Sequence, residues 1–452
     1  MTVVGLGIEG IDLVRFLTHE GARVTVSDSR PAERLAEALA AIDADQPALS
    51  LGENDPDVIL NADAVYVSQG VPWRLPVLEA ARARGVTVSS MTRLFFELCS
   101  VPIAGITGSS GKTTTTALTG AMLQAAGIDS VVGGNIGVGL LGLLEEIGPG
   151  TRPVVEVSHT QLQSVQESPH WGCLTNVTPN HLDQFSWDEY VDLKRRIFSF
   201  QRPDDVAIFN LDDPVSRDLA PQARGEVRFT SMAGALPGDG VALDGGYVVR
   251  HEGGTASRVL ARDELRLRGD HNVANVLQAT ALASLLGAPD DAIAVAARAF
   301  TGVPHRLEMI SQTRGVTWVN DSIATTPERT LAGLHSYTEP VVLLLGGRDK
   351  NLPLAELALE AGARCRAVVT FGEAGDLFAG ALRTGAPALH LERANDVASA
   401  VEAAARLAQP GDVVLFSPAG TSFDAYPNFE RRGEAFAEAV RALDHRLTSR
   451  GA

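Results

Sequence analysis

The sequence has few cysteines, no long apolar run and no excess of positive charge. Its three cysteines are widely spaced, which excludes both a disulfide framework and a CxxC zinc site. No apolar run approaches the ~20 residues that a membrane-spanning helix needs, and the N-terminal MTVVGLG lacks the basic and apolar regions of a signal peptide. The formal charge of −17 disfavours nucleic acids and anionic membranes as partners. We therefore expect a cytoplasmic protein that binds no nucleic acid and inserts into no membrane.

The length of 452 residues is enough for about three domains of ~150 residues each. Short apolar runs alternate with alanine-rich helical stretches, which is typical of βα units and mostly parallel sheets. We predict an α/β fold with a Rossmann-like N-terminal domain (1–99), a central domain with a mostly parallel sheet (100–302) and a Rossmann-like C-terminal domain (303–452). The turns LPGDG, DGG and EGG within 225–268 predict hairpins at an antiparallel edge of the central sheet.

Two glycine loops follow predicted strands. In the first, Gly5, Gly7 and Gly10 form G-x-G-x-x-G, and Asp28 ends the next strand. This pattern is typical of a dinucleotide-binding turn, in which a helix N-terminus points at a phosphate. A tight βα turn packed against a helix also recruits glycines, and both interpretations stay open. The section is short for a whole dinucleotide site, so a nucleotide-like ligand is favoured over hydride chemistry.

The second loop, Gly108-Ser109-Ser110-Gly111-Lys112-Thr113-Thr114, follows the strand VPIAGIT and opens a helix. Its backbone N–H groups can bind phosphate oxygens, Lys112 can place a positive charge at the β- and γ-phosphates, and Thr113 or Thr114 can bind Mg²⁺. Ile106 stands where strict Walker A spacing has its first glycine. A polar turn with a solvated lysine is the alternative. We predict that the central domain is a P-loop ATPase domain.

Polar residues end the two strands that follow this loop. Glu156 ends PVVEVS, where it can hold a phosphate-bound Mg²⁺ directly or through water. Asn176, His181 and Asp183 follow the next apolar strand. A lone histidine is more often structural than a ligand, but a position beside Glu156 favours a role in metal binding.

Lys194 falls within the apolar stripe of a predicted helix, together with Tyr190, Val191, Ile197 and Phe198. A buried lysine loses hydration, so its pKa falls and its neutral amine becomes accessible. The alternative is an aliphatic stem along the apolar surface with the ammonium in water or paired to an acid. Spacing alone favours that alternative.

Several motifs, taken in order along nearly the whole chain, resemble the Mur ligases. They are TGSSGKTTT, GGNIG, NVTPNHLD, NLDDP, GDHNVANVLQA, GVPHRLE, NDSIATTP, LLLGGRDKN and FSPAGTSFDAYPNFERRGEAF. The resemblance implies an ATP-dependent ligase of peptidoglycan precursor synthesis that forms an acyl phosphate and then an amide bond. Its nearest likeness is to the branch that adds glutamate, with D-glutamate expected, to UDP-N-acetylmuramoyl-L-alanine. Two Mg²⁺ ions and a monomer are also expected.

The resemblance assigns roles position by position. In the ATP site it implies phosphate and Mg²⁺ contacts from the P-loop, and nucleoside or phosphate contacts from Asn272, Asn275, Arg306 and Asp321. Glu156 and His181 would bind metal, and Lys194 would be carbamylated by CO₂ to bridge magnesium. The uridine diphosphate would lie at Ile8, Glu9, Asp28, Ser29 and Arg30. Further substrate contacts are expected at Ser68, Gly70, Asn135, Ser158, His181, Thr325, Lys350, Ser417, Ser422 and Phe423, with Lys350, Thr325, Ser422 and Phe423 forming the amino-acid pocket.

Four departures from the family pattern concern substrate binding. Ile323 replaces a lysine, Ser158-His159-Thr160-Gln161-Leu162 replaces a serine-rich SSFQL, Glu9 replaces a small hydroxyl residue, and Gln184 replaces an arginine. They leave open how the glutamate side chain is held, and a sister ligase adds L-glutamate to the same precursor. The sequence is also compatible with a folate polyglutamylating ligase, a Mur ligase for a different amino acid, an NAD-dependent dehydrogenase or a non-catalytic nucleotide-binding regulator.

Overall fold

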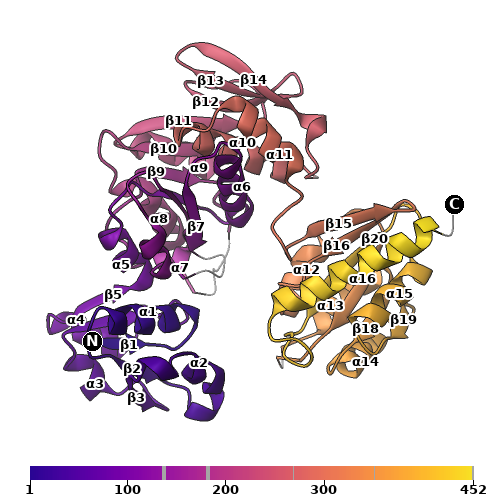
Figure 1. Ribbon diagram of the computed structural model, residues 1–452, viewed down its shortest axis with the longest axis horizontal. Helices are drawn as coiled ribbons and strands as arrows, with labels where there is room; N and C mark the ends of the chain where they lie inside the picture. The colour runs from indigo at the N-terminus through magenta and orange to yellow at the C-terminus, as the bar shows by residue number, and fades with distance from the viewer. Residues whose placement is uncertain (135–138, 180–183, 268, 351, 450–452) are drawn as a thin grey trace. The chain divides into compact units, whose positions relative to one another are not determined.

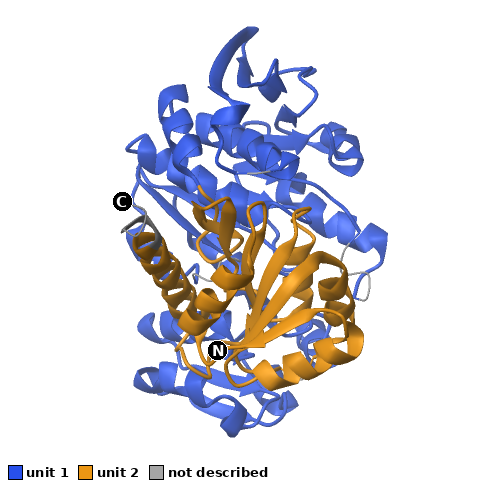
Figure 2. Cartoon of the chain, turned by 90° about the vertical axis from the view of Figure 1, so that its right-hand side faces the viewer, with its two compact units in different colours: residues 1–300 blue, residues 301–452 orange. Residues whose placement is uncertain are grey.

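The computed structural model describes residues 1–134, 139–179, 184–267, 269–350 and 352–449. Contacts within the chain divide it into two compact units, residues 1–300 and 301–452 (Figure 2). The first unit contains two sheets and the second contains one (Figure 1). The α/β class predicted from the sequence is confirmed. Among the described residues, no helix is both long enough and apolar enough to cross a membrane.

The first sheet is wholly parallel, with the strand order β3-β2-β1-β4-β5. Since β2 and β4 flank β1, the strand order reverses at β1, and ligands of such sheets bind beyond the carboxyl ends of the strands at that point. The residues just after β1 and β4 are Gly5 and Ser68. The elements are β1 (Thr2–Val4), α1 (Ile8–His19), β2 (Thr25–Asp28), α2 (Ala36–Ala41), β3 (Ala48–Leu51), α3 (Pro56–Leu60), β4 (Ala64–Val67), α4 (Pro76–Ala83), β5 (Thr87–Ser90) and α5 (Met91–Leu98).

The second sheet has the strand order β14-β13-β12-β11-β10-β9-β6-β8-β7. It is parallel from β7 to β12, while β13 and β14 are antiparallel, which confirms an antiparallel edge within 225–268. The strands are β6 (Ala104–Thr107), β7 (Ser130–Gly134), β8 (Arg152–Glu156), β9 (Trp171–Leu174), β10 (Val206–Asn210), β11 (Glu226–Ser231), β12 (Gly240–Asp244), β13 (Tyr247–Glu252) and β14 (Thr255–Ala261). The helices are α6 (Lys112–Ala125), α7 (His159–Leu162), α8 (Trp187–Ser199), α9 (Pro214–Leu219), α10 (Asp270–Leu285) and α11 (Asp290–Ala299).

Strand β6 is an interior strand of this second sheet, between β9 and β8, and is buried along its whole length. Helices cover both faces, so two separate hydrophobic clusters form: Phe198 and Phe209 belong to one, and Ile106 and Leu118 belong to the other. This double burial explains why the parallel strands are continuous apolar runs in the sequence. The carboxyl end of β6 is thereby held at a fixed place between β9 and β8.

The second unit has a six-stranded sheet in the order β15-β16-β20-β17-β18-β19, in which only the β15–β16 pair is antiparallel. Its strands are β15 (Glu308–Thr313), β16 (Val316–Asn320), β17 (Val341–Gly346), β18 (Cys365–Phe371), β19 (His390–Arg393) and β20 (Val413–Ala419). Its helices are α12 (Pro327–Leu334), α13 (Ala355–Arg364), α14 (Gly375–Gly385), α15 (Val397–Leu407) and α16 (Phe429–Ser449). The stacked rings of Phe416 and Phe436 join β20 to α16.

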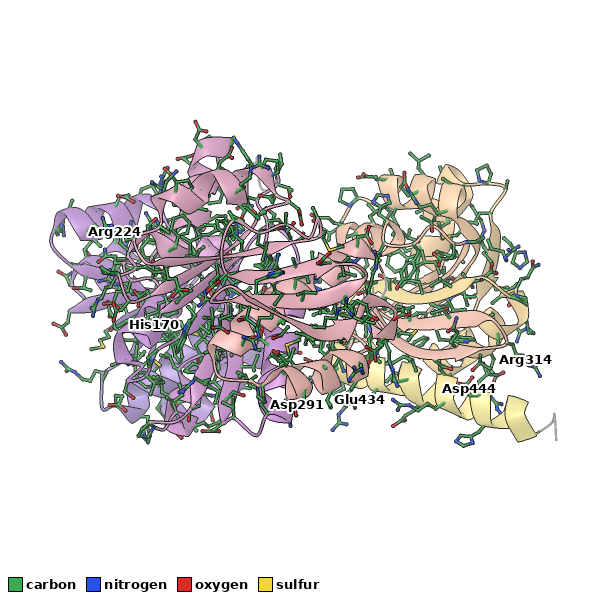
Figure 3. The ribbon with its side chains drawn as sticks, turned by 90° about the horizontal axis from the view of Figure 1, so that it is seen from above. His170, Arg224, Asp291, Arg314, Glu434 and Asp444 are labelled. Atoms are coloured by element: carbon green, nitrogen blue, oxygen red, sulfur yellow. The ribbon has the colours of Figure 1, made fainter. Side chains whose placement is uncertain are left out.

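Charged side chains from both units lie exposed on the outside of the sheets and helices, as Arg224, Asp291, Arg314 and Glu434 do (Figure 3). A charged side chain inside the protein is costly unless it is paired or serves a purpose. Buried charged side chains therefore indicate candidate functional sites.

Candidate active site

The glycine loop after β6 has the conformation of a phosphate-binding loop. A Cβ on Gly108 would lie 1.9 Å from Thr175 Oγ1, and one on Gly111 would lie 2.3 Å from Asn275 Oδ1. Both positions therefore require glycine. Helix α6 begins directly after Gly111, at Lys112, so its free N–H groups and its positive dipole end face the loop. This geometry suits an anionic oxygen group.

Lys112 is folded over this loop. Its Nζ donates hydrogen bonds to the carbonyl oxygens of Gly108 (3.0 Å) and Ser109 (3.2 Å). The neighbouring strand end supports the loop, because Asn176 Oδ1 accepts a hydrogen bond from the Ser110 N–H at 2.9 Å. Thr113 and Thr114 follow in the first turn of α6. Lys112 is therefore half-buried over the loop and only partly solvated.

The predicted adenine-contacting residues lie beside the loop. Asn272 and Asn275 belong to the first two turns of α10, and Asn275 Nδ2 donates to Asn272 Oδ1 at 3.2 Å. Asn275 is buried against Gly111. The glycine loop and the start of α10, more than 150 residues apart in the sequence, are therefore in contact through Gly111 and Asn275.

Glu156 and Lys194 are buried next to the P-loop, and each is only 1% exposed. Glu156 ends β8, paired with Ile106 of β6. Lys194 projects from α8 and donates a hydrogen bond to Thr107 Oγ1 at 3.1 Å. Burial lowers the pKa of Lys194 well below its usual value; the charge of Lys112 adds to this effect and that of Glu156 opposes it. Lys194 is buried, so the part of the alternative that places its ammonium in water is wrong, whereas pairing with an acid is compatible with the nearby charge of Glu156.

Helix α8 is fixed at its start, which orients Lys194. Ser186 and Glu189 form a capping box at its N-terminus. The Lys194 ammonium also lies 5.4 Å from the centroid of the Tyr190 ring. Thr107 donates its own hydroxyl hydrogen to the Val157 carbonyl at 2.6 Å, which leaves its oxygen lone pairs to accept the lysine. The position of the lysine nitrogen is therefore set by several contacts.

The oxygen donors here fit Mg²⁺, which binds proteins through one or two carboxylates plus substrate phosphates. Glu156 supplies a buried carboxylate, and the Thr113 hydroxyl lies at the start of α6, next to the phosphate loop. Within the described ranges, no group of three or more histidine, cysteine, aspartate or glutamate side chains is arranged around one point. His181 and Asn135, both predicted as site residues, lie outside the described residues.

A cavity of about 960 Å³ lies at the carboxyl end of the first sheet. It is lined by predicted substrate residues, namely Ile8, Glu9, Asp28, Ser29, Arg30, Ser68 and Gly70, and also by His159, Thr160 and Gln184. Asp28, which lines this cavity, accepts hydrogen bonds from the N–H groups of Leu6 and Arg30, both at 2.8 Å. Burial acts to raise the pKa of Asp28, but the bonds from Arg30 and Leu6 outweigh it and hold the pKa below its usual value. Asp28 therefore stays ionised and anchors Arg30.

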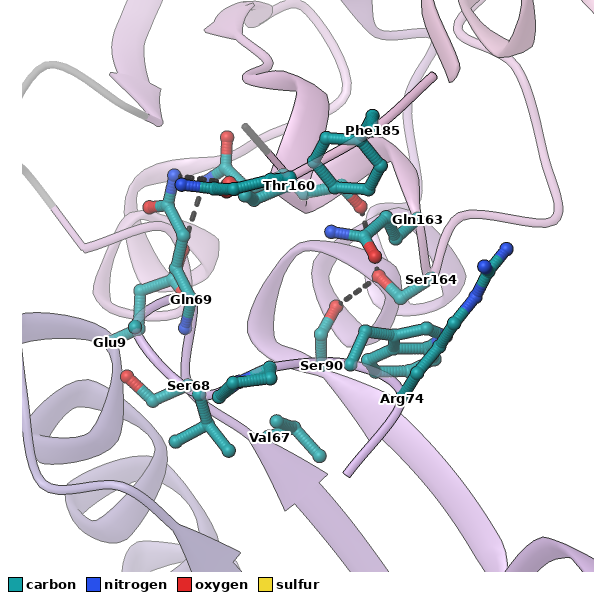
Figure 4. Close-up of a pocket in the computed structure, with 16 residues that line it drawn as sticks. Glu9, Val67, Ser68, Gln69, Arg74, Ser90, Thr160, Gln163, Ser164 and Phe185 are labelled. Atoms are coloured by element: carbon teal, nitrogen blue, oxygen red, sulfur yellow. Dashed lines mark hydrogen bonds between the residues drawn. The ribbon is translucent and has the colours of Figure 1, made fainter. Parts of the chain in front are cut away.

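A second cavity of about 460 Å³ shares Glu9, Ser68, Gln69, Thr160 and Gln184 with the first (Figure 4). Gln69 Nε2 crosses to the second sheet and donates to Ser158 Oγ and Thr160 Oγ1, both at 2.7 Å. Glu9 accepts hydrogen bonds from the Gln69 N–H (2.8 Å) and from Gln161 Nε2 (2.9 Å). Burial raises the pKa of Glu9, and these two hydrogen bonds only partly offset that effect.

The sequence did not point to Gln69 or Gln161 as site residues. The available signal was their position beyond buried parallel strands, where polar side chains gather: Gln69 lies two residues after β4, and Gln161 lies in α7, the short helix that follows β8. Ser158, which was predicted, caps α7 and holds Gln161 in place through a capping box.

The remaining predicted residues belong to the second unit. Asp321, just after β16, accepts a hydrogen bond from Ser417 Oγ at 2.7 Å; burial raises its pKa to about 7, although hydrogen bonds from Ser417 and Leu307 and the charge of Arg306 lower it. Lys350 Nζ donates to Thr325 Oγ1 at 3.2 Å. Ser422 is buried and Phe423 is half exposed after β20. The structure thus joins Asp321 to Ser417 and Lys350 to Thr325.

Three segments of the chain, one for each sheet, match known protein domain families. Residues 1–90 match the N-terminal domain of MurD-like Mur ligases, residues 106–283 match the Mur ligase middle domain, and residues 305–420 match the Mur ligase glutamate ligase domain. The chain belongs to the Mur ligase family, and it has the three-domain fold of that family.

Individual relatives match over almost the full length. A protein of Symbiobacterium thermophilum named UDP-N-acetylmuramoylalanine--D-glutamate ligase is 42% identical over 98% of this chain and 97% of its own. A protein of the same name from Anaeromyxobacter dehalogenans is 41% identical over 96% of each chain. The solved structures of MurF from Acinetobacter baumannii (TM-score 0.56, covering 92% of this chain and 91% of that one) and MurC from Thermotoga maritima (TM-score 0.55, covering 98% and 99%) are each 18% identical and share the fold.

Proposed function

We propose that this chain is an ATP-dependent ligase that joins D-glutamate to UDP-N-acetylmuramoyl-L-alanine, an activity of cytoplasmic peptidoglycan precursor synthesis. The observation that carries the proposal is the cluster of the half-buried Lys112 with the buried Glu156 and Lys194 near the carboxyl ends of β6 and β8. Full-length relatives that are named for this reaction support it. Neither a dehydrogenase nor a non-catalytic regulator has a use for a buried lysine beside a P-loop.

The chemistry has two steps. The terminal carboxylate of the acceptor attacks the γ-phosphorus of ATP, the bond to the β-phosphate oxygen breaks, and ADP leaves. The glutamate amine then attacks the acyl carbon, loses a proton, and displaces inorganic phosphate. Carboxylates are poor acyl donors, and phosphorylation turns one oxygen into a good leaving group. The enzyme is left to position the reactants and neutralise charge.

The residues of the central domain divide this work. The N–H groups of 108–111 and the start of α6 hold the phosphates, and Lys112 turns from the loop carbonyls toward the β- and γ-phosphate oxygens. As the family resemblance implies, Asn272 and Asn275 would contact the adenine, Arg306 a phosphate and Asp321 the ribose. Mg²⁺, when bound, withdraws charge from the phosphate oxygens. Thr113 and Glu156 would hold the first ion, and His181 and Lys194 would hold a second.

Lys194 needs a chemical change to hold a cation. Burial lowers the pKa of Lys194 and so makes its neutral amine more accessible. A neutral amine adds to CO₂: the nitrogen–carbon bond forms, a proton leaves to water, and a carbamate results. The carbamate carries a negative charge in place of the ammonium. It would lie beside Thr107, where the nitrogen now is.

The other two sites hold the organic substrates. The cavity of about 960 Å³ takes the uridine diphosphate at Ile8, Glu9, Asp28, Ser29 and Arg30, with the sugar at Ser68 and Gly70. Asn135 and Ser158 contact the muramoyl-alanine part, and Thr325, Lys350, Ser417, Ser422 and Phe423 take the glutamate. The domain limits 1–99, 100–302 and 303–452, the monomeric state and the cytoplasmic location stay predictions.

Release of inorganic phosphate tests the proposal. Purified protein, ATP, Mg²⁺ and UDP-N-acetylmuramoyl-L-alanine should release phosphate with D-glutamate, and leaving out either the acceptor or the amino acid should stop it. L-glutamate in the same assay tests the sister activity. Phosphate release with L-glutamate but not D-glutamate would overturn the stereochemical assignment, and release with neither would overturn the proposed function.

Glu9 is expected to weaken acceptor binding through charge. Its carboxylate lies in the first turn of α1, in the cavity assigned to the diphosphate. Glu9→Gln should lower the KM for the acceptor roughly three- to tenfold at alkaline pH, because a like charge is removed from a partly buried site. Because the pKa of Glu9 is raised, the wild-type KM should fall toward the variant's as the pH is lowered and the carboxyl is protonated.

Steady-state kinetics across the pH range measure this effect. Glu20→Gln, at the exposed opposite end of α1, is the matched control and should behave as wild type. A higher KM in Glu9→Gln would mean instead that the carboxylate accepts a hydrogen bond from the acceptor.

A further inference from the structure

A tight turn after β16 binds two cationic side chains. The Thr325 N–H donates to the Ile323 carbonyl at 2.9 Å, which closes the turn over residues 323–325. Lys350, from the segment after β17, donates from Nζ to Thr325 Oγ1 at 3.2 Å. Arg329, in the first turn of α12, donates from a terminal guanidinium nitrogen to the Ile323 carbonyl at 3.2 Å. The two cations are therefore anchored to residues only two positions apart.

A third cation lies beneath this turn. Arg432 is 0% exposed, and its guanidinium donates to Ser322 Oγ (3.1 Å), to the Ser322 carbonyl (2.8 Å) and to the Gly420 carbonyl (2.9 Å), which are all neutral groups. Burial lowers the pKa of Lys350, and the charges of Arg329 and Arg432 lower it further, so the three charges are within electrostatic reach of one another.

No acidic side chain of the described residues forms an ion pair with Lys350 or Arg329 within 4.0 Å. The nearby Arg348, by contrast, is paired with Glu373 at 3.1 Å. Like charges held together repel, and a ligand that brings negative charge relieves that repulsion. The surface over residues 323–325 therefore suits an anion with more than one negative group.

We propose that Arg329 is a specificity-determining residue that binds the side-chain carboxylate of the amino-acid substrate while Lys350 binds the α-carboxylate. This inference rests on the proposed function, since glutamate carries two carboxylates and one amine. A guanidinium forms two parallel hydrogen bonds to a carboxylate, whereas an ammonium acts as a point charge. The two cations thus distinguish a dicarboxylic amino acid from its amide.

The same arrangement accounts for Ile323, where the family pattern has a lysine. An apolar side chain cannot bind a carboxylate. Arg329 of α12 donates a hydrogen bond to the Ile323 carbonyl, so its guanidinium supplies a positive charge at the turn where the family lysine is missing. Positive charge here also lowers the pKa of the incoming ammonium, so a larger fraction of the amino acid is present as the neutral nucleophile.

The variant Arg329→Gln tests the inference, with phosphate release as the assay at saturating ATP and acceptor. The KM for D-glutamate should rise roughly 10- to 100-fold, as expected for loss of a charge-assisted hydrogen bond, while kcat changes less than about threefold. The ratio of kcat/KM for D-glutamate to that for D-glutamine should fall by the same factor. Arg329→Lys should keep part of the preference, and the KM values for ATP and acceptor should not change.

Arg383→Gln is the matched control, because Arg383 is an exposed arginine on helix α14 of the same unit. Inhibition by glutarate, a dicarboxylate without the amine, gives a second readout and should weaken in Arg329→Gln but not in Arg383→Gln. A purely structural role of Arg329 would raise the KM for both amino acids alike and leave their ratio unchanged.

The outcomes separate this inference from the function on which it rests. An active wild type together with an unchanged glutamate-to-glutamine ratio in Arg329→Gln would overturn the role of Arg329 and leave the ligase activity standing. A wild type that releases no phosphate with D-glutamate would overturn the function, and the role of Arg329 with it. Weaker glutarate inhibition together with a lower ratio would support the inference.

Discussion

Lys194→Ala is expected to lower kcat for ligation by roughly 10³-fold or more, which is the size of effect seen when a main charge-stabilising group is removed from an active site. Lys194 is 1% exposed, has a lowered pKa and lies beside Glu156 and Lys112. After carbamylation it would contribute a carboxylate-like group to cation binding. Alanine removes that group and leaves a space where it stood.

Rescue experiments separate this role from a loss of folding. Because the space is the size of a short chain ending in a carboxylate, acetate or propionate should restore part of the activity of Lys194→Ala. Lys194→Arg keeps the positive charge but cannot form the carbamate, so it should be as inactive as alanine. Arg195→Ala, at a half-exposed position on the same helix, is the control and should retain activity. Full activity in Lys194→Arg would contradict the carbamate.

Lys194→Met gives an independent check on stability. Taking a lysine side chain out of water costs desolvation energy, as the lowered pKa of Lys194 indicates. Methionine has a similar volume and no charge. This variant should therefore unfold at a denaturant concentration no lower than that of the wild type while losing activity, which assigns the loss to chemistry and not to folding.

Lys112→Ala is the second variant with a large expected effect. It should lower kcat/KM for ATP by roughly 10³-fold, because the cation that meets the transferring phosphoryl group is lost. In the structure the ammonium donates hydrogen bonds to the Gly108 and Ser109 carbonyls of the glycine loop. The backbone N–H groups of the loop remain, so some nucleotide binding should persist.

Equilibrium binding of ATP alongside turnover measures both effects. Lys112→Ala should lose more in turnover than in affinity, since the lysine acts most strongly on the charge that develops at the leaving oxygen. Ser199→Ala, on α8 and distant from the loop in sequence, is the control; its hydroxyl donates to the Arg195 carbonyl. Equal losses in affinity and in turnover would contradict a role in the transition state.

The P-loop and Glu156 could be predicted from the sequence because their signals are local. A strand, a glycine loop and a helix start are read from adjacent residues, and the carboxyl ends of neighbouring parallel strands meet at one edge. The predicted diphosphate-binding residues from Ile8 to Arg30 also follow from one βαβ unit, and the structure places them around one cavity.

The polar bridge between the first two sheets could not be predicted in the same way. Gln69 bonds to Ser158 and Thr160 across about 90 residues of sequence, and Glu9 bonds to Gln161 across 152. Such pairs depend on how two sheets pack against each other, and no local periodicity encodes that. The strand order of the second sheet is likewise non-local, since β6 lies between β9 and β8.

The burial of Lys194 was indicated better by the rarity of lysine in this sequence than by helix spacing. Helix spacing favoured a solvated stem, because spacing reports which face a residue occupies and not whether its nitrogen reaches water. The chain contains only three lysines among its 38 basic residues, namely Lys112, Lys194 and Lys350. The other basic residues are arginines. The three lysines lie at the P-loop, on the buried face of α8 and at the turn that contains Thr325.

The origin of the oxygen in the released phosphate tests the central claim most directly. The acceptor is labelled with a heavy oxygen isotope in the carboxylate of its alanine, and the phosphate produced during ligation to D-glutamate is analysed by mass spectrometry. Attack of the carboxylate on ATP predicts that each phosphate carries one labelled oxygen taken from the acceptor. Phosphate without the label, formed at the same rate as the ligated product, would contradict the acyl-phosphate route.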